Sequence, residues 1–160
     1  MSEKRGRTTA APVPRTLIAD PSEGLRGWLS AGAGRSAGLV TAVSHAWEVL
    51  WHLAHEHCDL VITGPQLRDV PPVQLLAMVR TTGLTTPFVL LLPWSSSSMI
   101  QQVNRLAPVE IVDDWSDGHS LRRASERLLG SSPPPDTRLH ARREKLLRIA
   151  RQVVTRKLPV

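Results

Sequence analysis

The sequence has almost no cysteine and no long apolar run, and each shortage excludes a class of protein. Cys58 is the only cysteine among 160 residues, so we expect neither a disulfide within the chain nor a zinc site built from cysteines. No apolar run approaches the roughly 18 residues of a membrane-spanning helix. The basic N-terminal residues lack the apolar core of a secretory signal. These shortages predict a soluble, cytoplasmic protein.

Lysine is missing from residues 16–135, and positive charge is concentrated at the two ends of the chain. The formal net charge of +6 divides into +3 for residues 1–15, −3 for residues 16–135 and +6 for residues 136–160. Hydrophobic residues make up 41% of the chain, which is enough for a packed core. We therefore expect a mildly acidic central domain between a basic arm and a basic tail.

Composition divides the chain into four segments. Residues 1–15 are polar and basic and contain prolines, which predicts a flexible arm. Residues 131–135 read SSPPP and predict an extended, proline-rich linker. The central domain occupies residues 16–130, and residues 136–160 form the tail.

Five short apolar runs alternate with helical patterns in the central domain. The apolar runs are residues 16–19, 38–43, 59–63, 88–92 and 109–112, and a helical pattern follows each of them. Runs that are apolar throughout are typical of parallel strands buried on both faces. The pattern predicts an α/β fold, namely a flavodoxin-like (βα)5 three-layer sandwich with parallel strand order 2-1-3-4-5, plus an extra C-terminal helix.

The strand ends carry the sequences LIADP, CDLVITG, PFVLLLP and VEIVDD. Their order and spacing over about residues 16–130 resemble the receiver domain of two-component response regulators. The resemblance implies acids after the first strand that hold Mg²⁺ and an aspartate after the third strand that accepts phosphate. It also implies a hydroxyl residue after the fourth strand and a lysine after the fifth. Mg²⁺ prefers carboxylate ligands, and a lysine neutralises the phosphoryl charge.

The matching positions of this sequence lack that chemistry. A glycine stands where the phosphate-accepting aspartate is expected, so no aspartyl phosphate can form there, and the lysine position holds an acid. The resemblance therefore implies a degenerate receiver, or pseudo-receiver, with no catalytic residue and no cofactor. The degenerate positions are, in chain order, Asp20, Gly64, Leu92 or Pro93, and Asp113 or Asp114.

Two groups of side chains raise the question of a metal site. Asp20, Asp113 and Asp114 follow strands whose carboxyl ends meet at one edge of the sheet, where they would bind Mg²⁺ or Ca²⁺ weakly or serve as solvated loop acids. His52 and His55 have a spacing that places both on one helical face. For both groups we favour the simpler interpretation, namely solvated loop acids and surface histidines, so no bound metal is expected.

Four of the five tryptophans bear on possible interfaces. Trp94 and Trp115 follow the fourth and fifth strands, near the fourth-helix and fifth-strand surface that receivers use for output and dimerisation. They are candidate interface anchors, with filling of the core as the alternative. Trp47 and Trp51 lie one helical turn apart and are favoured as core residues.

The tail has the pattern of a basic amphipathic helix. Leu139, Leu146 and Val153 recur every seven residues, and Ile149 lies between them. Pairing with a partner helix or a second copy of the chain is favoured. Packing onto its own core, contact with nucleic-acid phosphates and binding to anionic lipid are the alternatives. The candidate phosphate or anion contacts are Arg142, Arg143, Arg148 and Arg151.

These features predict a response-regulator-like signalling or scaffold protein that works without phosphorylation and acts through protein–protein interaction, including a homodimer. The alternative is a DNA-associated transcriptional or nucleoid regulator that uses its basic tail. The sequence contains no nucleophile elbow, P-loop or GxGxxG motif, so no enzymatic activity is expected.

Overall fold

The sheet at the centre of the molecule has the predicted strand order. The computed structural model describes residues 13–93, 95–114, 118–131 and 139–157. Five parallel strands lie in the order β2-β1-β3-β4-β5. This confirms the α/β fold class and the order 2-1-3-4-5. The strands are β1 (Arg15–Ala19), β2 (Leu39–Val43), β3 (Leu60–Thr63), β4 (Phe88–Leu91) and β5 (Val109–Val112).

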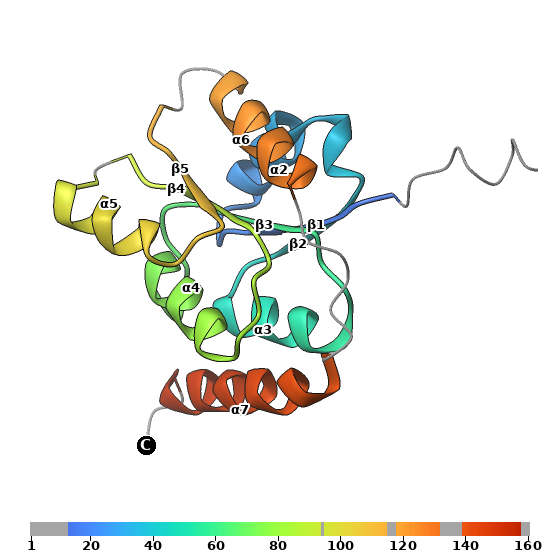
Figure 1. The fold of residues 1–160 in the computed structure, drawn as a ribbon, viewed down its shortest axis with the longest axis vertical. Helices are drawn as coiled ribbons and strands as arrows, with labels where there is room; N and C mark the ends of the chain where they lie inside the picture. Colours follow the sequence, from blue (N-terminus) through green and yellow to red (C-terminus); the bar gives the residue numbers. More distant parts are fainter. Residues whose placement is uncertain (1–12, 94, 115–117, 132–138, 158–160) are drawn as a thin grey trace, which may run out of the picture.

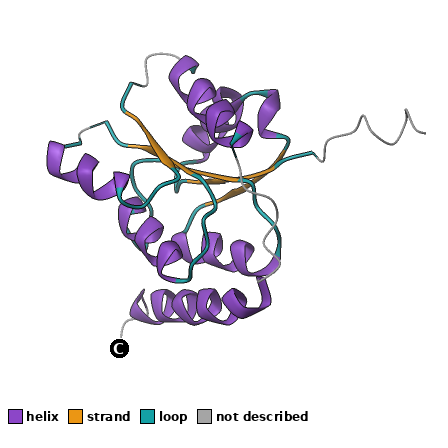
Figure 2. Cartoon of the chain, in the orientation of Figure 1, coloured by secondary structure: helices purple, strands orange, loops and turns teal. Residues whose placement is uncertain are grey.

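Helices cover both faces of this sheet (Figure 1). One face carries α2 (Glu23–Ala33) and α6 (His119–Gly130), and a short 3-10 helix, η1 (Arg35–Ala37), precedes β2. The other face carries α3 (Ala46–His55), α4 (Pro72–Thr81) and α5 (Ser97–Asn104). Each face has its own apolar core, and Figure 2 shows the sheet as the middle layer between the helices.

Burial along the strands follows their position in the sheet. All four residues of β3 and all four residues of β4 are buried, as expected for inner strands. In β2, by contrast, four of five residues are exposed. This departs from the expectation of burial on both faces, because β2 pairs with β1 alone and forms one edge of the sheet.

The C-terminal helix α7 (Leu139–Lys157) packs along α3 and adds a layer outside the sandwich (Figure 1). Leu146, Ala150 and Val153 are buried in the same core as the apolar residues of α3. The helix α3 can bury two sides because it is apolar around most of its circumference. Its buried residues are Ala46, Val49, Leu50, Leu53 and Ala54.

This packing corrects the favoured prediction that the tail pairs with another chain. Leu146 and Val153 are 0% and 4% exposed within their own chain, and Ile149 is partly buried against the same core. Their apolar face is therefore not available to a partner. The side chain of Leu139 lies outside the described part of the structure.

Most of the predicted arm and most of the predicted linker lie outside the described residues. The predicted arm is described from residue 13, and its last residue, Arg15, is the first of β1. The predicted linker is described only at Ser131, directly after α6. None of the described helices is both long enough and apolar enough to cross a membrane.

Candidate functional site at the carboxyl edge of the sheet

The strand register brings the four degenerate positions to one edge of the sheet. Ala19 at the end of β1 is paired with Thr63 at the end of β3, and Leu91 of β4 is paired with Val112 of β5. The residues that follow these ends therefore lie along the same edge, where folds of this class bind their ligands. They are Asp20, Gly64, Leu92 and, for the fourth position, Asp113 or Asp114.

Asp20 is buried, although it follows the end of a strand. Its side chain accepts a hydrogen bond from the backbone N–H of Ser22 at 2.8 Å, and its own N–H donates to the carbonyl of Val43 at 3.0 Å. The Arg26 guanidinium donates to the Asp20 carbonyl at 2.8 Å. Burial raises the pKa of the Asp20 carboxyl, and the Ser22 hydrogen bond and the Arg26 charge oppose this rise. The residue is 3% exposed, so the carboxyl is turned into the fold.

Gly64 leaves the space that the Asp20 carboxyl occupies. A Cβ atom added at Gly64 would overlap Asp20 Oδ1 and lie 2.7 Å from Asp20 Cγ. The backbone of Gly64 is held in place, since its N–H donates to the Ala19 carbonyl at 2.9 Å. A side chain at position 64 would therefore displace the Asp20 carboxyl, and an aspartate there would compete with Asp20 for the same volume.

Thr63, one residue earlier, carries a polar atom without a partner. It is fully buried, and its Oγ1 has no hydrogen-bond partner among the described residues. An unsatisfied buried hydroxyl costs about 1–3 kcal/mol of stability. Sequence analysis missed this residue, because a threonine at the end of a buried strand is ordinary and its partners depend on the fold.

The fourth strand is followed by an apolar side chain and the fifth strand by two acidic side chains. Leu92 is 8% exposed, and its N–H donates to the Val112 carbonyl at 3.0 Å, so this position supplies an apolar side chain and no hydroxyl. Asp113 and Asp114 are exposed and supply negative charge where the family pattern has a lysine. No lysine occurs between residues 16 and 135, so the central domain has no ammonium group to replace it.

The structure gives no support to a metal site at this edge. Within the described ranges, no group of three or more histidine, cysteine, aspartate or glutamate side chains is arranged to hold a metal ion. Asp20 is turned inward, whereas Asp113 and Asp114 are exposed, so the three carboxylates do not converge as the alternative required. His52 and His55 have separate partners, namely the Glu56 carboxylate at 2.6 Å and the Trp51 carbonyl at 2.7 Å.

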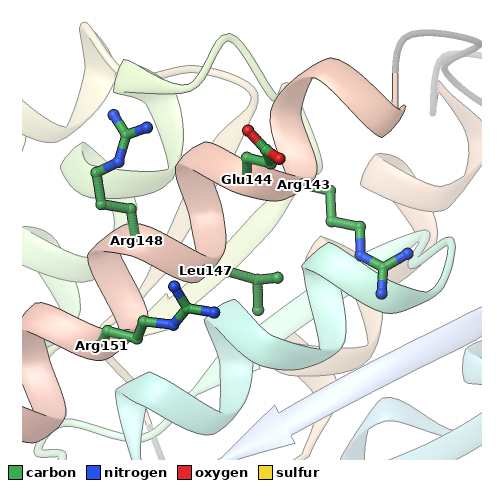
Figure 3. Close-up of a pocket in the computed structure, with 5 residues that line it drawn as sticks. All are labelled: Arg143, Glu144, Leu147, Arg148 and Arg151. Atoms are coloured by element: carbon green, nitrogen blue, oxygen red, sulfur yellow. The ribbon is translucent and has the colours of Figure 1, made fainter.

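The candidate arginines of the tail divide into two sets. Arg143, Arg148 and Arg151 are exposed, and with Glu144 and Leu147 they line a shallow pocket of about 610 Å³ (Figure 3). Arg142 is only partly exposed, and its guanidinium lies beside Gly83, just after α4. Three of the four predicted anion contacts therefore share one surface, and Arg142 lies apart from them.

The candidate interface residues Trp94 and Trp115 lie outside the described residues. An interface or a homodimer through the α5 and β5 surface therefore stays a prediction. The exposure of Trp51 was not expected from the sequence, which favoured this tryptophan as a core residue. Trp51 is 45% exposed, since α7 covers only part of α3.

Comparison with solved structures identifies the fold. The receiver domain of the Francisella response regulator 1452 matches with a TM-score of 0.66 and 14% identity, over 73% of this chain and 97% of that chain. The non-phosphorylated HemR receiver domain from Leptospira biflexa matches with a TM-score of 0.66 and 20% identity, over 76% and 98%. The BeF3-activated DrrB receiver domain matches with a TM-score of 0.63 and 16% identity, over 74% and 99%.

Sequence comparison adds nothing to this likeness. No protein-family model matches the chain, and a search of curated proteins found no match. The structural likeness covers about three quarters of the chain and nearly the whole of each receiver domain. The chain therefore has the fold of response-regulator receiver domains.

Proposed function

We propose that the chain is a non-catalytic, receiver-fold module that works without phosphorylation and acts through protein–protein interaction. The observation that carries this proposal is that a glycine follows β3, at the position where the receiver pattern has the phosphate-accepting aspartate. Gly64 removes the nucleophile, and the carboxyl of Asp20 fills the space that a side chain would need. A phosphoryl group would find neither an acceptor nor room at this position.

The surrounding chemistry supports the same proposal. Aspartyl phosphorylation needs a carboxylate nucleophile, a bound divalent cation and positive charge that stabilises the transferred phosphoryl group. The carboxyl of Asp20 is 3% exposed and already accepts the Ser22 N–H at 2.8 Å, so it offers little access to a cation at the surface of the fold. Asp114 adds negative charge at the lysine position.

The proposal is tested by incubating the full chain with acetyl phosphate and Mg²⁺ and measuring its intact mass. We expect no phosphoryl adduct. A parallel incubation with beryllium fluoride should leave the thermal midpoint unchanged, whereas the DrrB receiver domain, which has been solved in a BeF3-activated form, serves as the positive control. A phosphoryl adduct on any aspartate of this chain would contradict the proposal.

A second candidate function is supported by Arg143, Arg148 and Arg151. The three guanidinium groups are exposed, and none makes an ion pair within the described part of the chain. They would suit the phosphates of DNA. If all three neutralise a phosphate, binding should weaken about 40-fold between about 50 and 200 mM salt. A fluorescently labelled DNA duplex titrated at both salt concentrations measures this, and the absence of binding at the lower one excludes the candidate.

A further inference from the structure

A groove runs between α3 and α7 on the outer side of the molecule. Its volume is about 430 Å³. Trp51 of α3 and Val154 of α7 are 45% and 38% exposed, so two large apolar side chains that are distant in sequence meet in one hollow. Exposed apolar side chains gathered in a hollow mark a binding surface more often than single exposed residues do. The groove is lined by Trp47, Trp51, His55, Leu147, Ala150, Arg151, Val154 and Thr155.

The groove continues into a basic surface. Leu147 and Arg151 line both the groove and the neighbouring arginine pocket, so the two hollows share a boundary. Figure 3 shows Arg143 and Arg151 on either side of Leu147, with Arg148 pointing away. None of these arginines makes an ion pair within the described ranges. Their charges are therefore available to an acidic ligand.

The indole of Trp51 is held in one orientation. It stacks on the His55 ring with the ring centroids 4.2 Å apart and the planes at 28°, and it meets the His52 ring edge-on at 5.1 Å. His55 Nδ1 donates to the Trp51 carbonyl at 2.7 Å, which fixes the ring that carries the stack. A side chain that is already ordered loses less entropy when a ligand binds. Tryptophan and arginine are also the residues most enriched at binding hot spots.

We infer that this groove binds an acidic, amphipathic segment of a partner protein. Apolar side chains of the segment contact Trp51 and Val154, and its carboxylates pair with Arg143 and Arg151. The inference rests on the proposed function, because it names the surface and the partner chemistry of a module that acts through protein–protein interaction. The groove brings the apolar side chains of Leu147, Ala150 and Val154 together in a hollow, which suits an inserted side chain better than a flat bilayer or a phosphate backbone.

A second copy of the chain is a poorer occupant of the groove. In a twofold dimer the same patch is present on both subunits, so two surfaces that each carry Arg143, Arg148 and Arg151 would be brought together. Like charges brought together across an interface oppose association. An acidic segment brings the opposite charge and avoids this repulsion.

The inference is tested by panning a displayed library of random 16-residue peptides against the full chain. We expect the enriched peptides to be net negative, with apolar residues at helical spacing. A synthetic copy of the most enriched peptide should bind the Trp51→Ala variant about 30-fold more weakly, which is the effect of losing a hot-spot side chain. Arg151→Glu should weaken binding by about tenfold or more. Panning against Arg151→Glu should select less acidic peptides.

Control variants separate the groove from the rest of the surface. Val40→Ala changes an exposed apolar residue on β2, and Arg123→Glu reverses an exposed charge on α6, on the far side of the sheet. Both should leave the peptide affinity within about twofold. Circular dichroism melting curves of the Trp51→Ala variant serve as the control for its folding. Arg151→Glu, at an exposed position, tests the groove independently of that variant.

Three results would overturn the inference: no enriched peptide, enriched peptides without acidic bias, or binding that Trp51→Ala and Arg151→Glu leave unchanged. It would also be overturned if a DNA duplex, or vesicles of phosphatidylcholine and phosphatidylglycerol, bound more tightly than the selected peptide and lost more affinity in Trp51→Ala. Panning uses no phosphoryl donor. An aspartyl phosphate would therefore refute the proposed function without changing peptide binding, and failed selection would refute the groove alone.

Discussion

The close fit between Asp20 and Gly64 makes a prediction about stability. A methyl group added by Gly64→Ala would overlap Asp20 Oδ1, so the Asp20 side chain has to move. The movement breaks its 2.8 Å hydrogen bond from the Ser22 N–H and repacks a buried carboxyl. Overpacking of a buried site costs about 1–3 kcal/mol, and we expect a loss of about 2 kcal/mol in the free energy of unfolding.

A double-mutant cycle measured by urea unfolding separates the overlap from other effects. In an Asp20→Ala background the obstructing carboxyl is gone, so Gly64→Ala should cost less than about 0.5 kcal/mol and the coupling energy should be about 1.5 kcal/mol. Gly27→Ala is the matched control, because an added Cβ there meets no atom within 4 Å and alanine favours the helix. Equal costs of Gly64→Ala in both backgrounds would refute the account of this site.

Three further predictions concern single side chains. Thr63→Val removes the unpartnered hydroxyl and should raise the free energy of unfolding by about 1 kcal/mol, whereas a loss would mean that Oγ1 is hydrogen-bonded in solution. Urea unfolding should show Val153→Ala, at a buried position, destabilising by about 1–2 kcal/mol, and the neighbouring exposed Val154→Ala changing stability by less than about 0.5 kcal/mol. The raised pKa of Asp20 means that its ionisation opposes folding as pH rises through its folded pKa, so Asp20→Asn should gain stability relative to wild type at neutral pH. The gain should shrink as pH falls below that pKa, and a pH-independent difference would contradict this.

The fold could be predicted from the sequence because parallel strands buried on both faces leave a strong local signal. Runs such as residues 88–92 are apolar throughout and short, and their alternation with helical patterns permits few topologies. The exposure of β2 is not visible in its composition, since an edge strand and an inner strand can have the same composition, but it agrees with the predicted order, which places this strand at an edge.

The position of the tail could not be predicted from the tail itself. The seven-residue spacing of Leu146 and Val153 is compatible with a helix of another chain and with a helix of the same chain. The deciding signal lies in α3, where Trp47 and Trp51 line a groove with α7 and add apolar surface to the buried residues of the same helix. A helix that is apolar on two sides requires a second covering layer.

The sequence predicts which residues lie together at the carboxyl edge of the sheet, but it does not predict how the Asp20 side chain is oriented there. The carboxyl ends of parallel strands meet at one edge, so the grouping of Asp20, Gly64, Leu92 and Asp114 follows from topology. The inward turn of Asp20 depends on which rotamer the backbone permits once Gly64 leaves a space, and sequence spacing carries no information on rotamers.

The docking of α7 makes the groove a composite surface, with three of its eight lining residues contributed by α3 and five by α7. The groove exists only while α7 is in place. By thermodynamic linkage, a ligand present at about 100 times its Kd would hold the docked helix more firmly by about 2.7 kcal/mol. Removal of α7 from the chain would abolish the proposed binding surface and uncover the apolar side of α3. The proposed binding surface and the burial of the apolar side of α3 therefore depend on the same helix–helix contact.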